Sequence, residues 1–363
     1  MNTEFQVSRR SFAVGRTVAV ALAGLVAASA VVTGPAREPG QAANAVSTYT
    51  PDQSRQLLGK DGRFTILLLG SDARPSLSGL RTDAILIASV DPVTGKAAIA
   101  SIPRDTAYFP LSPLRTGKFA GKINGLYSWI KLHYPRRNPG TTLRLIIGKA
   151  LGIEIDAYAI IGFEGFRHGV NDVSGLDVYV PVTLYDPVYS MRAGQHGVRF
   201  YRGWNHLVDL RALAYARIRH LAGGDYNRSR RQQQLIASAI GKLRGIGDGV
   251  LGGLLLATRG LYKTDLPMAL APLAFAMVSQ ADELHARKTV FQPRTFAYAI
   301  SGYRNILKFV AVRAWVRTYF PPIHYYGTWV PPEPAPTPSP TPADTPTPTP
   351  SDTPAPTPTP LGG

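Results

Sequence analysis

Short apolar runs bounded by glycine or polar residues divide the first part of the chain into predicted strands. The run FTILLLG, from Phe64 to Gly70, is typical of a buried strand that delivers the polar residues SDAR to an exit loop. The runs AILIASV and KAAIASI flank DPVTG, a favourable turn sequence, and therefore predict an antiparallel hairpin. Counting outward from that turn places Asp83 roughly opposite Arg104. The segments RTD and PRD should therefore meet at one end of a sheet.

The later part of the chain contains apolar patterns typical of strands and others typical of helices. DVYVPV predicts another strand, whereas LRALAYARI, RRQQQLIASAIGKL and the stretch from Leu143 to Leu151 have helical spacing of apolar residues. The apolar runs GLLLATRGL and LAPLAFAMV are each too short to span a membrane and indicate core or pocket wall. We therefore expect an α/β (or α+β) fold with a mixed sheet.

The N-terminus indicates export. Arg9, Arg10 and Arg16 precede an uncharged run from Thr17 to Thr33, slightly short for a membrane helix but within the usual range. The positive flank favours a cytoplasmic N-terminus and an external body. A cleaved signal peptide, ending at ASA or ANA, is the alternative, and SRRSF also resembles a twin-arginine signal. A buried helix of the domain is a third interpretation, which would not imply export.

Composition divides the chain into four predicted segments. These are a cytoplasmic N-terminus with the anchor or signal (1–34), a linker (35–62), a catalytic domain (63–326) and a disordered Pro/Thr-rich tail (327–363). The tail places a proline at nearly every second position, so it cannot build a core. Glycosylation of its threonines, passage through a cell wall and an inert spacer all remain open.

Charge and cysteine content narrow the function. The 363 residues are 45% hydrophobic, as in ordinary globular proteins, but carry a formal net charge of +17. Such an excess predicts an acidic partner: nucleic acid, anionic lipid or a phosphorylated substrate. The chain has no cysteine, which excludes disulfides, thiolate metal sites and cysteine nucleophiles. Nucleic acid would explain the charge but neither an N-terminal anchor nor aspartates among arginines, so we expect no nucleic-acid partner.

Charged residues gather where the predicted apolar elements end, which is where sites are usually built. They are Asp72, Arg74, Arg81, Asp83, Arg104, Asp105, Arg217, Arg219, Asp225, Arg228, Arg230, Arg231 and, with them, Gln232.

The segment GGDYNRSRRQQQ places its charges on a helix. If a helix begins near Asp225, then Asp225, Arg228 and Gln232 share one face, with Arg231 beside them. Arg230 lies about 200° from Arg228 and is expected to be a solvated surface charge. Helix N-termini favour anions, and Asp225 can serve as the N-cap. The plainer interpretation is a charged solvent-exposed face with an aspartate cap.

Arginines in this number suit a pyrophosphate, because guanidinium is planar, always charged and able to bind two oxygens at once. Aspartates beside phosphates are costly unless a divalent cation bridges them, so Asp72 and Asp83 are candidate ligands of Mg²⁺ (or Mn²⁺). Together these residues suggest phosphoryl transfer. The sequence contains no phosphate-binding P-loop motif, no HExxH motif and no GxSxG motif.

Seven motifs occur in the order ILLLGSDAR, RTDAILIASVD, SIPRDT, KINGLY, FEGF, ALAYARIR and GDYNRSRRQ. In this order the chain resembles the LytR-CpsA-Psr family of bacterial cell-envelope proteins from about Phe64 to Leu243. KTVFQPRTFAYAISGYRNIL, followed by an apolar helix, also looks like the family's closing strand and helix.

The resemblance implies a single-pass membrane phosphotransferase whose catalytic domain lies on the extracytoplasmic face. It would move a glycopolymer from a polyprenyl-pyrophosphate carrier to peptidoglycan through a phosphodiester. The polymer could be teichoic acid, a capsule or arabinogalactan. The implied fold is a central mixed sheet flanked by helices, with an apolar pocket for the lipid and arginines at its mouth.

The resemblance also implies residue roles. Asp72 and Asp83 would hold Mg²⁺, and Asp225 and Gln232 would lie near the head group. Asp105 or Asp225 could orient or deprotonate the acceptor hydroxyl, with Arg104 and Arg228 also in the catalytic set. The arginines expected to contact the pyrophosphate or support those contacts are Arg74, Arg81, Arg104, Arg217, Arg219, Arg228 and Arg231.

The sequence departs from the family pattern at Ser174 and Asp209, where glycine is common, which puts loop shape in doubt more than activity. Two other functions would use the same arginines: a non-catalytic envelope binder or regulator, and a hydrolase of the same pyrophosphate.

Overall fold

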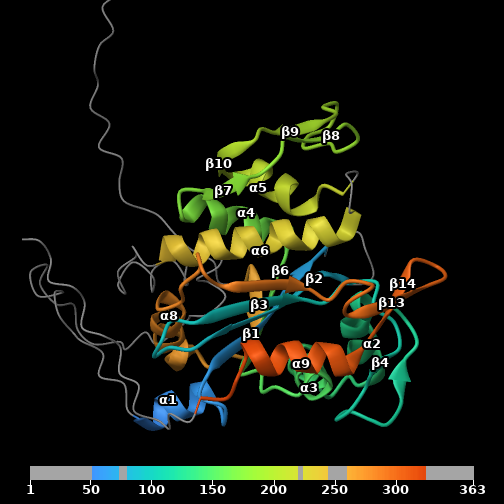
Figure 1. The fold of residues 1–363 in the computed structure, drawn as a ribbon, viewed down its shortest axis with the longest axis vertical. Coiled ribbons are helices and arrows are strands. Elements are labelled where there is room, and N and C mark those ends of the chain that lie inside the picture. Colours follow the sequence, from blue (N-terminus) through green and yellow to red (C-terminus); the bar gives the residue numbers. More distant parts are fainter. Residues whose placement is uncertain (1–50, 73–79, 220–223, 244–259, 324–363) are drawn as a thin grey trace, which may run out of the picture. The chain divides into compact units, whose positions relative to one another are not determined.

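The computed structural model describes residues 51–72, 80–219, 224–243 and 260–323, which form a central sheet with helices on both faces (Figure 1). Its α-helices are α1 (Pro51–Leu58), α2 (Leu126–His133), α3 (Pro139–Leu151), α4 (Phe163–Asp172), α5 (Asp209–Arg217), α6 (Gly224–Leu243), α8 (Ala271–Ser279) and α9 (Phe309–Tyr319). Short 3₁₀ turns are η1 (Ile123–Gly125) and η2 (Met268–Leu270). The strands are β1 (Phe64–Ser71), β2 (Thr82–Val90), β3 (Ala97–Ser101), β4 (Phe109–Pro110), β5 (Lys118–Phe119), β6 (Ala157–Ile161), β7 (Leu176–Val180), β8 (Leu184–Asp186), β9 (Val198–Phe200), β10 (Gly203–Leu207), β11 (Tyr262–Thr264), β12 (Arg287–Val290), β13 (Ala297–Ile300) and β14 (Arg304–Leu307).

The central sheet is mixed, as the sequence predicts. Its strand order is β11-β6-β1-β2-β3-β12. The β1–β6 and β3–β12 pairs are parallel, and the β1–β2, β2–β3 and β6–β11 pairs are antiparallel. The predicted buried strand and the predicted hairpin are therefore confirmed as β1 and as β2–β3.

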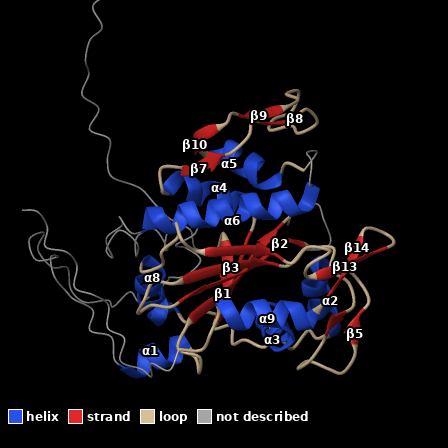
Figure 2. Cartoon of the chain, viewed as in Figure 1, coloured by secondary structure: helices blue, strands red, loops and turns tan. Residues whose placement is uncertain are grey.

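Alternating side chains of β1 build two cores. Ile66 and Leu68 pack with apolar residues of α4, α5, α6 and α8 on one face. Leu67 and Leu69 pack with α2, α3 and α9 on the other face. Because successive side chains of a strand point to opposite faces, a strand buried on both sides must be apolar throughout, as FTILLLG is. Figure 2 shows these helical layers above and below the sheet.

Two small antiparallel strand pairs form an outer layer beyond α4, α5 and α6 (Figure 2). The β7–β10 and β8–β9 pairs are each antiparallel. Their inward residues, including Val178, Phe200 and Leu207, are buried in the same core as α6. The predicted strand DVYVPV is thus β7 of this layer, outside the central sheet.

The ends of the chain differ in part from the sequence-based expectation. Residues expected as linker contain α1, and Leu57 and Leu58 of this helix are buried in the core. LAPLAFAMV forms η2 and α8 with buried apolar side chains, which confirms its assignment to the core. Among the described residues, no helix combines the length and apolarity needed to cross a bilayer. The run Thr17–Thr33, most of GLLLATRGL and the Pro/Thr-rich tail lie outside those residues.

Both positions that depart from the glycine pattern have a left-handed backbone. Ser174 has φ 54° and Asp209 has φ 43°. Glycine adopts this region without the steric cost that a Cβ imposes. The main chain therefore keeps the conformation that glycine would favour, and the two side chains accommodate it.

Candidate active site

A cavity of about 440 Å³ opens between the sheet and helices α4, α5 and α6. Its position is set by β1 and β2, because the smallest pair in their register, Gly70 opposite Ala84, lines the cavity and leaves space above the sheet. The apolar lining is Leu68, Leu69, Ala84, Leu86, Ile161, Phe163, Phe166, Val188, Leu213, Ala216, Leu235 and Ile236. The charged lining is Asp72, Asp83, Arg104, Asp186, Arg217, Arg219 and Arg228. One cavity therefore offers both an apolar interior and a set of fixed cations.

A second apolar space lies against α6. A second, smaller cavity of about 50 Å³ shares Leu68 and Ile236 with the first. Its other walls include Val90, Ile99 and Leu243.

Arg104 connects three segments of the chain. Its Nη1 donates to Asp83 Oδ2 at 3.1 Å, and its Nε lies 2.7 Å from Asp225 Oδ2. Asp105 Oδ2 is 3.6 Å from the same Nε. Burial lowers the pKa of Arg104, but the three surrounding carboxylates outweigh burial and raise it. Arg104 is therefore a fixed cation in the cavity wall.

Asp83 is held as a carboxylate. Its Oδ1 accepts a hydrogen bond from Asn124 Nδ2 at 3.1 Å, opposite the bond from Arg104 to Oδ2. Burial alone raises the pKa of Asp83, but the Asn124 hydrogen bond and the cations Arg104 and Arg228 hold it below its ordinary value. A negative charge thus persists beside the two arginines.

Arg228 is a buried cation close to another cation. Only 6% of Arg228 is exposed, and its Nη2 donates to the main-chain oxygen of Asp83 at 3.1 Å and to Asp225 Oδ2 at 3.4 Å. Burial lowers the pKa of Arg228, and the charge of Arg104 lowers it further, against the attraction of Asp225 and Asp83. Within the described residues its Nε has no hydrogen-bond partner. A buried donor without a partner is costly, and an anion in the cavity would relieve both that cost and the repulsion between the guanidiniums.

Arg231 has a different position from Arg228. It is 5% exposed, does not line the cavity, and donates to the main-chain oxygens of Tyr215 and Ile218. Burial lowers its pKa to about 10. Gln232 lines the cavity and donates to the main-chain oxygen of Ala216 at 3.2 Å. Both side chains therefore hold the C-terminal end of α5, which presents Arg217 and Arg219 to the cavity.

Arg217 lies between aromatic rings. Its guanidinium carbon is 4.3 Å from the centroid of Phe163 and 5.7 Å from that of Tyr189, and Nη1 donates to Tyr189 Oη at 3.3 Å. Stacking of this kind fixes the plane of a guanidinium while leaving its edges free for oxygens. Arg219 is exposed, and its main-chain nitrogen donates to the buried Asp186 at 3.3 Å.

The remaining predicted residues lie around this cavity. Asp105 and Asp225 flank Arg104 without lining the cavity, and Asp105 also pairs with Lys122 Nζ at 2.6 Å. Asp225 lies in the first turn of α6, where its carboxylate pairs with Arg104 and Arg228. The side chain of Arg81 is exposed and outside the cavity lining. Arg74 lies outside the described residues. Arg230 is exposed, as its helical position predicts.

Several contributors carried no assigned role in the sequence. Asn124 and Lys122 come from KINGLY, a motif used for the family resemblance but given no function. Phe163 and Tyr189 support Arg217 from α4 and from the loop after β8. KINGLY is a usable signal for the first two, because it follows the predicted hairpin end closely along the chain and carries polar side chains. Phe163 opens FEGF, another of the seven motifs, whereas no local signal points to Tyr189.

The two predicted metal ligands fit a divalent cation that is completed by substrate. Asp72 and Asp83 both line the cavity, and the main-chain nitrogen of Arg81 donates to Asp72 Oδ1 at 3.1 Å. In the described part of the chain, no cluster of three or more His, Cys, Asp or Glu could hold a metal alone. Magnesium is commonly held by one or two carboxylates together with substrate phosphates and water. The donor set fits that arrangement.

The fold and the site define an α/β protein in which several arginines line one largely apolar cavity. The chain belongs to the LytR_cpsA_psr family, which it matches over residues 36–291. The expected fold, a mixed six-stranded sheet flanked by helices in one family-type domain, is confirmed.

Named relatives include both transferases and regulators. The chain is 31% identical over 183 residues to the Bacillus subtilis (strain 168) polyisoprenyl-teichoic acid–peptidoglycan teichoic acid transferase TagV, covering 50% of this chain and 44% of TagV. It is 32% identical over 177 residues to the regulatory protein MsrR of Staphylococcus aureus (strain Mu50 / ATCC 700699), covering 48% of each. The match thus spans about half the length of these relatives.

Solved structures share the fold. The crystal structure of B. subtilis TagV matches with a TM-score of 0.56 at 23% identity, over 72% of this chain and 98% of that one. TagT bound to LIIa-WTA matches with a TM-score of 0.52 at 22% identity, over 71% and 89%.

Proposed function

We propose that the protein transfers a glycopolymer from a polyprenyl-pyrophosphate carrier to peptidoglycan through a phosphodiester bond. The observation that carries this proposal is the placement of Arg104 and Arg228 at an apolar cavity, with the Nε of Arg228 buried and without a partner among the described residues. The cavity suits a polyprenyl chain and the two guanidiniums suit its pyrophosphate.

The reaction is a substitution at phosphorus. The acceptor hydroxyl oxygen forms a bond to the phosphorus that carries the polymer, the bond from that phosphorus to the bridging oxygen breaks, and polyprenyl phosphate leaves. Arg104, Arg228 and Arg217 would offset the negative charge that builds on the phosphate oxygens. The hydroxyl proton would pass to one of the carboxylates beside Arg104, namely Asp105 or Asp225.

Magnesium belongs to the proposal. Asp72 and Asp83 would hold the ion, which supplies charge compensation to the pyrophosphate when bound. Both oxygens of Asp83 already accept hydrogen bonds, one from Asn124 and one from Arg104, so the ion would share this carboxylate with these two side chains. Dependence on Mg²⁺ or Mn²⁺ is accordingly expected.

The named relatives support the direction of the proposal. TagV is named a polyisoprenyl-teichoic acid–peptidoglycan teichoic acid transferase, and TagT has been crystallised with LIIa-WTA. We also propose a single-pass membrane protein with its catalytic domain outside the cytoplasm, because Arg9, Arg10 and Arg16 precede the apolar run Thr17–Thr33.

A non-catalytic binder is the second candidate. MsrR is named a regulatory protein, and a partnerless buried Nε on Arg228 would favour capture of an anion whether or not it reacts. Hydrolysis is the third, and differs only in that water rather than a sugar hydroxyl attacks the phosphorus.

The full chain in detergent, with Mg²⁺, a lipid-pyrophosphate-linked glycopolymer and peptidoglycan, tests the proposal. We expect polyprenyl phosphate to be released, and Arg228→Ala to abolish release while the circular dichroism spectrum is unchanged. Tight binding of the donor without turnover would exclude the transferase and support the non-catalytic binder. Release that does not require peptidoglycan would indicate hydrolysis.

A further inference from the structure

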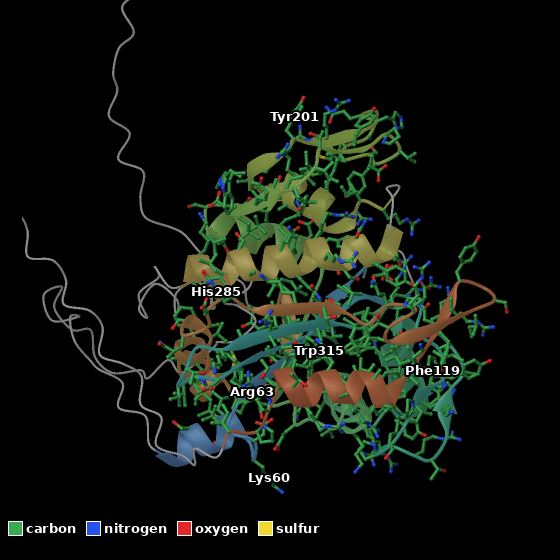
Figure 3. The ribbon with its side chains drawn as sticks, in the orientation of Figure 1. Lys60, Arg63, Phe119, Tyr201, His285 and Trp315 are labelled. Atoms are coloured by element: carbon green, nitrogen blue, oxygen red, sulfur yellow. The ribbon has the colours of Figure 1, made fainter. Side chains whose placement is uncertain are left out.

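A second groove lies on another side of α6, outside the candidate active site. Its volume is about 540 Å³, and its walls come from β7, β10, α6 and the segment between α8 and β12. The residues that matter here are Tyr179, Trp204, Gln234, Ser238, Lys242 and Leu284. Figure 3 labels His285, the residue that follows Leu284 in the chain, near one end of α6.

Two aromatic side chains form one wall of the groove. Trp204 is 73% exposed and Tyr179 is 46% exposed, and they lie directly opposite each other in the β7–β10 register. Their ring centroids are 5.7 Å apart at an interplanar angle of 71°. Leaving rings of this size in water forfeits the free energy of burying them, so an exposed and mutually fixed pair marks a surface that contacts a ligand.

The opposite wall is a face of α6 with small side chains. Ala237, Ser238 and Gly241 line the groove, whereas Arg228 and Gln232 of the same helix line the active-site cavity. At about 100° per residue these two sets lie on different faces of the helix. The small side chains give the groove its depth beneath the aromatic rings.

Gln234 holds the α6 wall of the groove against strand β7. Gln234 Nε2 donates to the main-chain oxygen of Tyr179 at 3.2 Å, and its Oε1 accepts from Tyr215 Oη at 2.8 Å. The position of Tyr179 over α6 is therefore set by the folded protein.

Charges in the groove are compensated within it. Asp177 accepts from Lys242 Nζ at 2.5 Å and pairs with His206 Nδ1 at 2.6 Å. Lys288 Nζ donates to the main-chain oxygen of Glu283 at 3.1 Å, and the negative charge of Glu283 opposes the lowering of the Lys288 pKa by burial. Among the described residues that line it, the groove thus offers aromatic faces and hydrogen-bonding groups but no uncompensated cation cluster. This combination disfavours phosphate, nucleic acid and an anionic bilayer as occupants.

From these contacts we propose that the groove binds a saccharide chain. A pyranose ring has an apolar C–H face that packs on an aromatic ring, and a rim of hydroxyl or acetamido groups that hydrogen-bonds to side chains. Trp204 and Tyr179 supply the aromatic surface, and Ser238, Lys242 and Asp177 supply the polar partners. The volume suits a short oligosaccharide segment.

The groove would hold a polymer away from the reacting phosphate. Ser238 is ten residues from Arg228 along α6, which corresponds to about 15 Å of helix. The identity of the sugar chain rests on the proposed function: it would be either the peptidoglycan acceptor or the transferred glycopolymer. In both cases the groove would raise the affinity for polymeric substrate and leave the chemical step unchanged.

Fluorescence titration of the full chain in detergent tests the proposal with two probes. One is a peptide-free glycan tetrasaccharide of alternating N-acetylglucosamine and N-acetylmuramic acid, and the other is a neutral hexose tetrasaccharide. We expect at least one probe to bind with a change in tryptophan emission. Trp204→Ala should weaken binding by about tenfold or more, and Trp204→Phe should retain most of it. The matched control is Tyr201→Ala, an exposed aromatic of the same layer that does not line the groove (Figure 3), and it should bind as the wild type does.

The outcomes separate this proposal from the transferase. Preference for the amino-sugar probe would assign the acceptor, and preference for the hexose probe would assign the transferred polymer. Arg104→Ala should bind the probe normally, since Arg104 is outside the groove. Probe binding without any transfer activity would contradict the proposed transferase and still support the saccharide groove. The saccharide-binding proposal would be overturned if the wild type bound neither probe at millimolar concentration, or if Trp204→Ala bound them equally well. Neither result would bear on the proposed transferase.

Discussion

Arg104 and Asp83 form an ion pair across the end of the β2–β3 hairpin, with 3.1 Å between Nη1 and Oδ2. Leu86 pairs with Ser101 in that hairpin, and the same register continued outward brings position 83 opposite position 104. The guanidinium also reaches Asp225 at the start of α6. One side chain therefore joins the sheet to the helix that carries Arg228.

Arg104→Lys should therefore reduce transfer by about 100-fold or more, because a single ammonium cannot contact both Asp83 and Asp225 in the geometry of a guanidinium. The measurement is the rate of polyprenyl phosphate release at saturating donor. Lys308→Arg makes the opposite substitution at a half-buried cation outside the cavity lining and should leave the rate unchanged. Normal turnover by Arg104→Lys would show that Arg104 only balances charge.

Arg231 is expected to be more important for stability than its exposed neighbour Arg230. Arg231→Met should lower the free energy of unfolding by about 2–4 kcal/mol, because the main-chain oxygens of Tyr215 and Ile218 would lose a buried donor. Urea unfolding of the full chain in detergent measures the change. Arg230→Met removes a neighbouring exposed arginine and should cost less than about 0.5 kcal/mol. Equal effects of the two substitutions would contradict the assignment.

These arginines show what the sequence can and cannot predict. Strand periodicity and turn chemistry were sufficient for the Asp83–Arg104 register, and helical spacing was sufficient to place Arg230 outside. Helical spacing also put Arg231 beside Arg228, but it could not reveal that the end of α5 lies against Arg231. That contact joins elements 13 to 16 residues apart through side chain and main chain, so it depends on tertiary packing.

A pH dependence is expected from Asp61. Burial raises the pKa of Asp61 from its ordinary value of 3.8 to about 6. Because the folded state binds this proton more tightly than the unfolded chain, the stabilisation is present at low pH and is lost as pH rises from about 4 to about 6. Asp61→Asn should remove about 1–2 kcal/mol of the fall in unfolding free energy across that window.

The test compares urea unfolding at the two ends of the window. If the free energy of unfolding changed equally with pH for wild type and Asp61→Asn, Asp61 would have the same pKa in the folded and the unfolded state.

Ser174 offers a gain in stability. Its φ of 54° is unfavourable for a residue with a Cβ, so Ser174→Gly should raise the free energy of unfolding by about 0.5–1 kcal/mol. Ser174→Ala keeps the Cβ and should give no such gain. Thermal unfolding of the two variants side by side makes the comparison, and a stabilised Ala variant would refute the explanation.

The cavity itself was beyond local sequence reasoning. Its floor depends on the Gly70–Ala84 pair, its roof on α4, α5 and α6, and its aromatic support on Phe163 and Tyr189. Apolar runs predicted buried elements but could not say that a space remains between them. Residue chemistry alone suggests a pyrophosphate among the arginines, whereas the lipid pocket and the role of each arginine are implied by the family resemblance. The structure places most of these charged residues around one cavity.

The most direct test of the central claim follows the fate of the phosphate during turnover in H₂¹⁸O. The full chain, Mg²⁺, a lipid-pyrophosphate-linked glycopolymer and peptidoglycan are incubated, and the phosphate joined to the polymer is analysed by mass spectrometry. Transfer predicts one polymer covalently bound to peptidoglycan for each polyprenyl phosphate released, with no ¹⁸O in the new phosphodiester. Polymer phosphate that carries ¹⁸O and stays unattached to peptidoglycan would contradict the transferase.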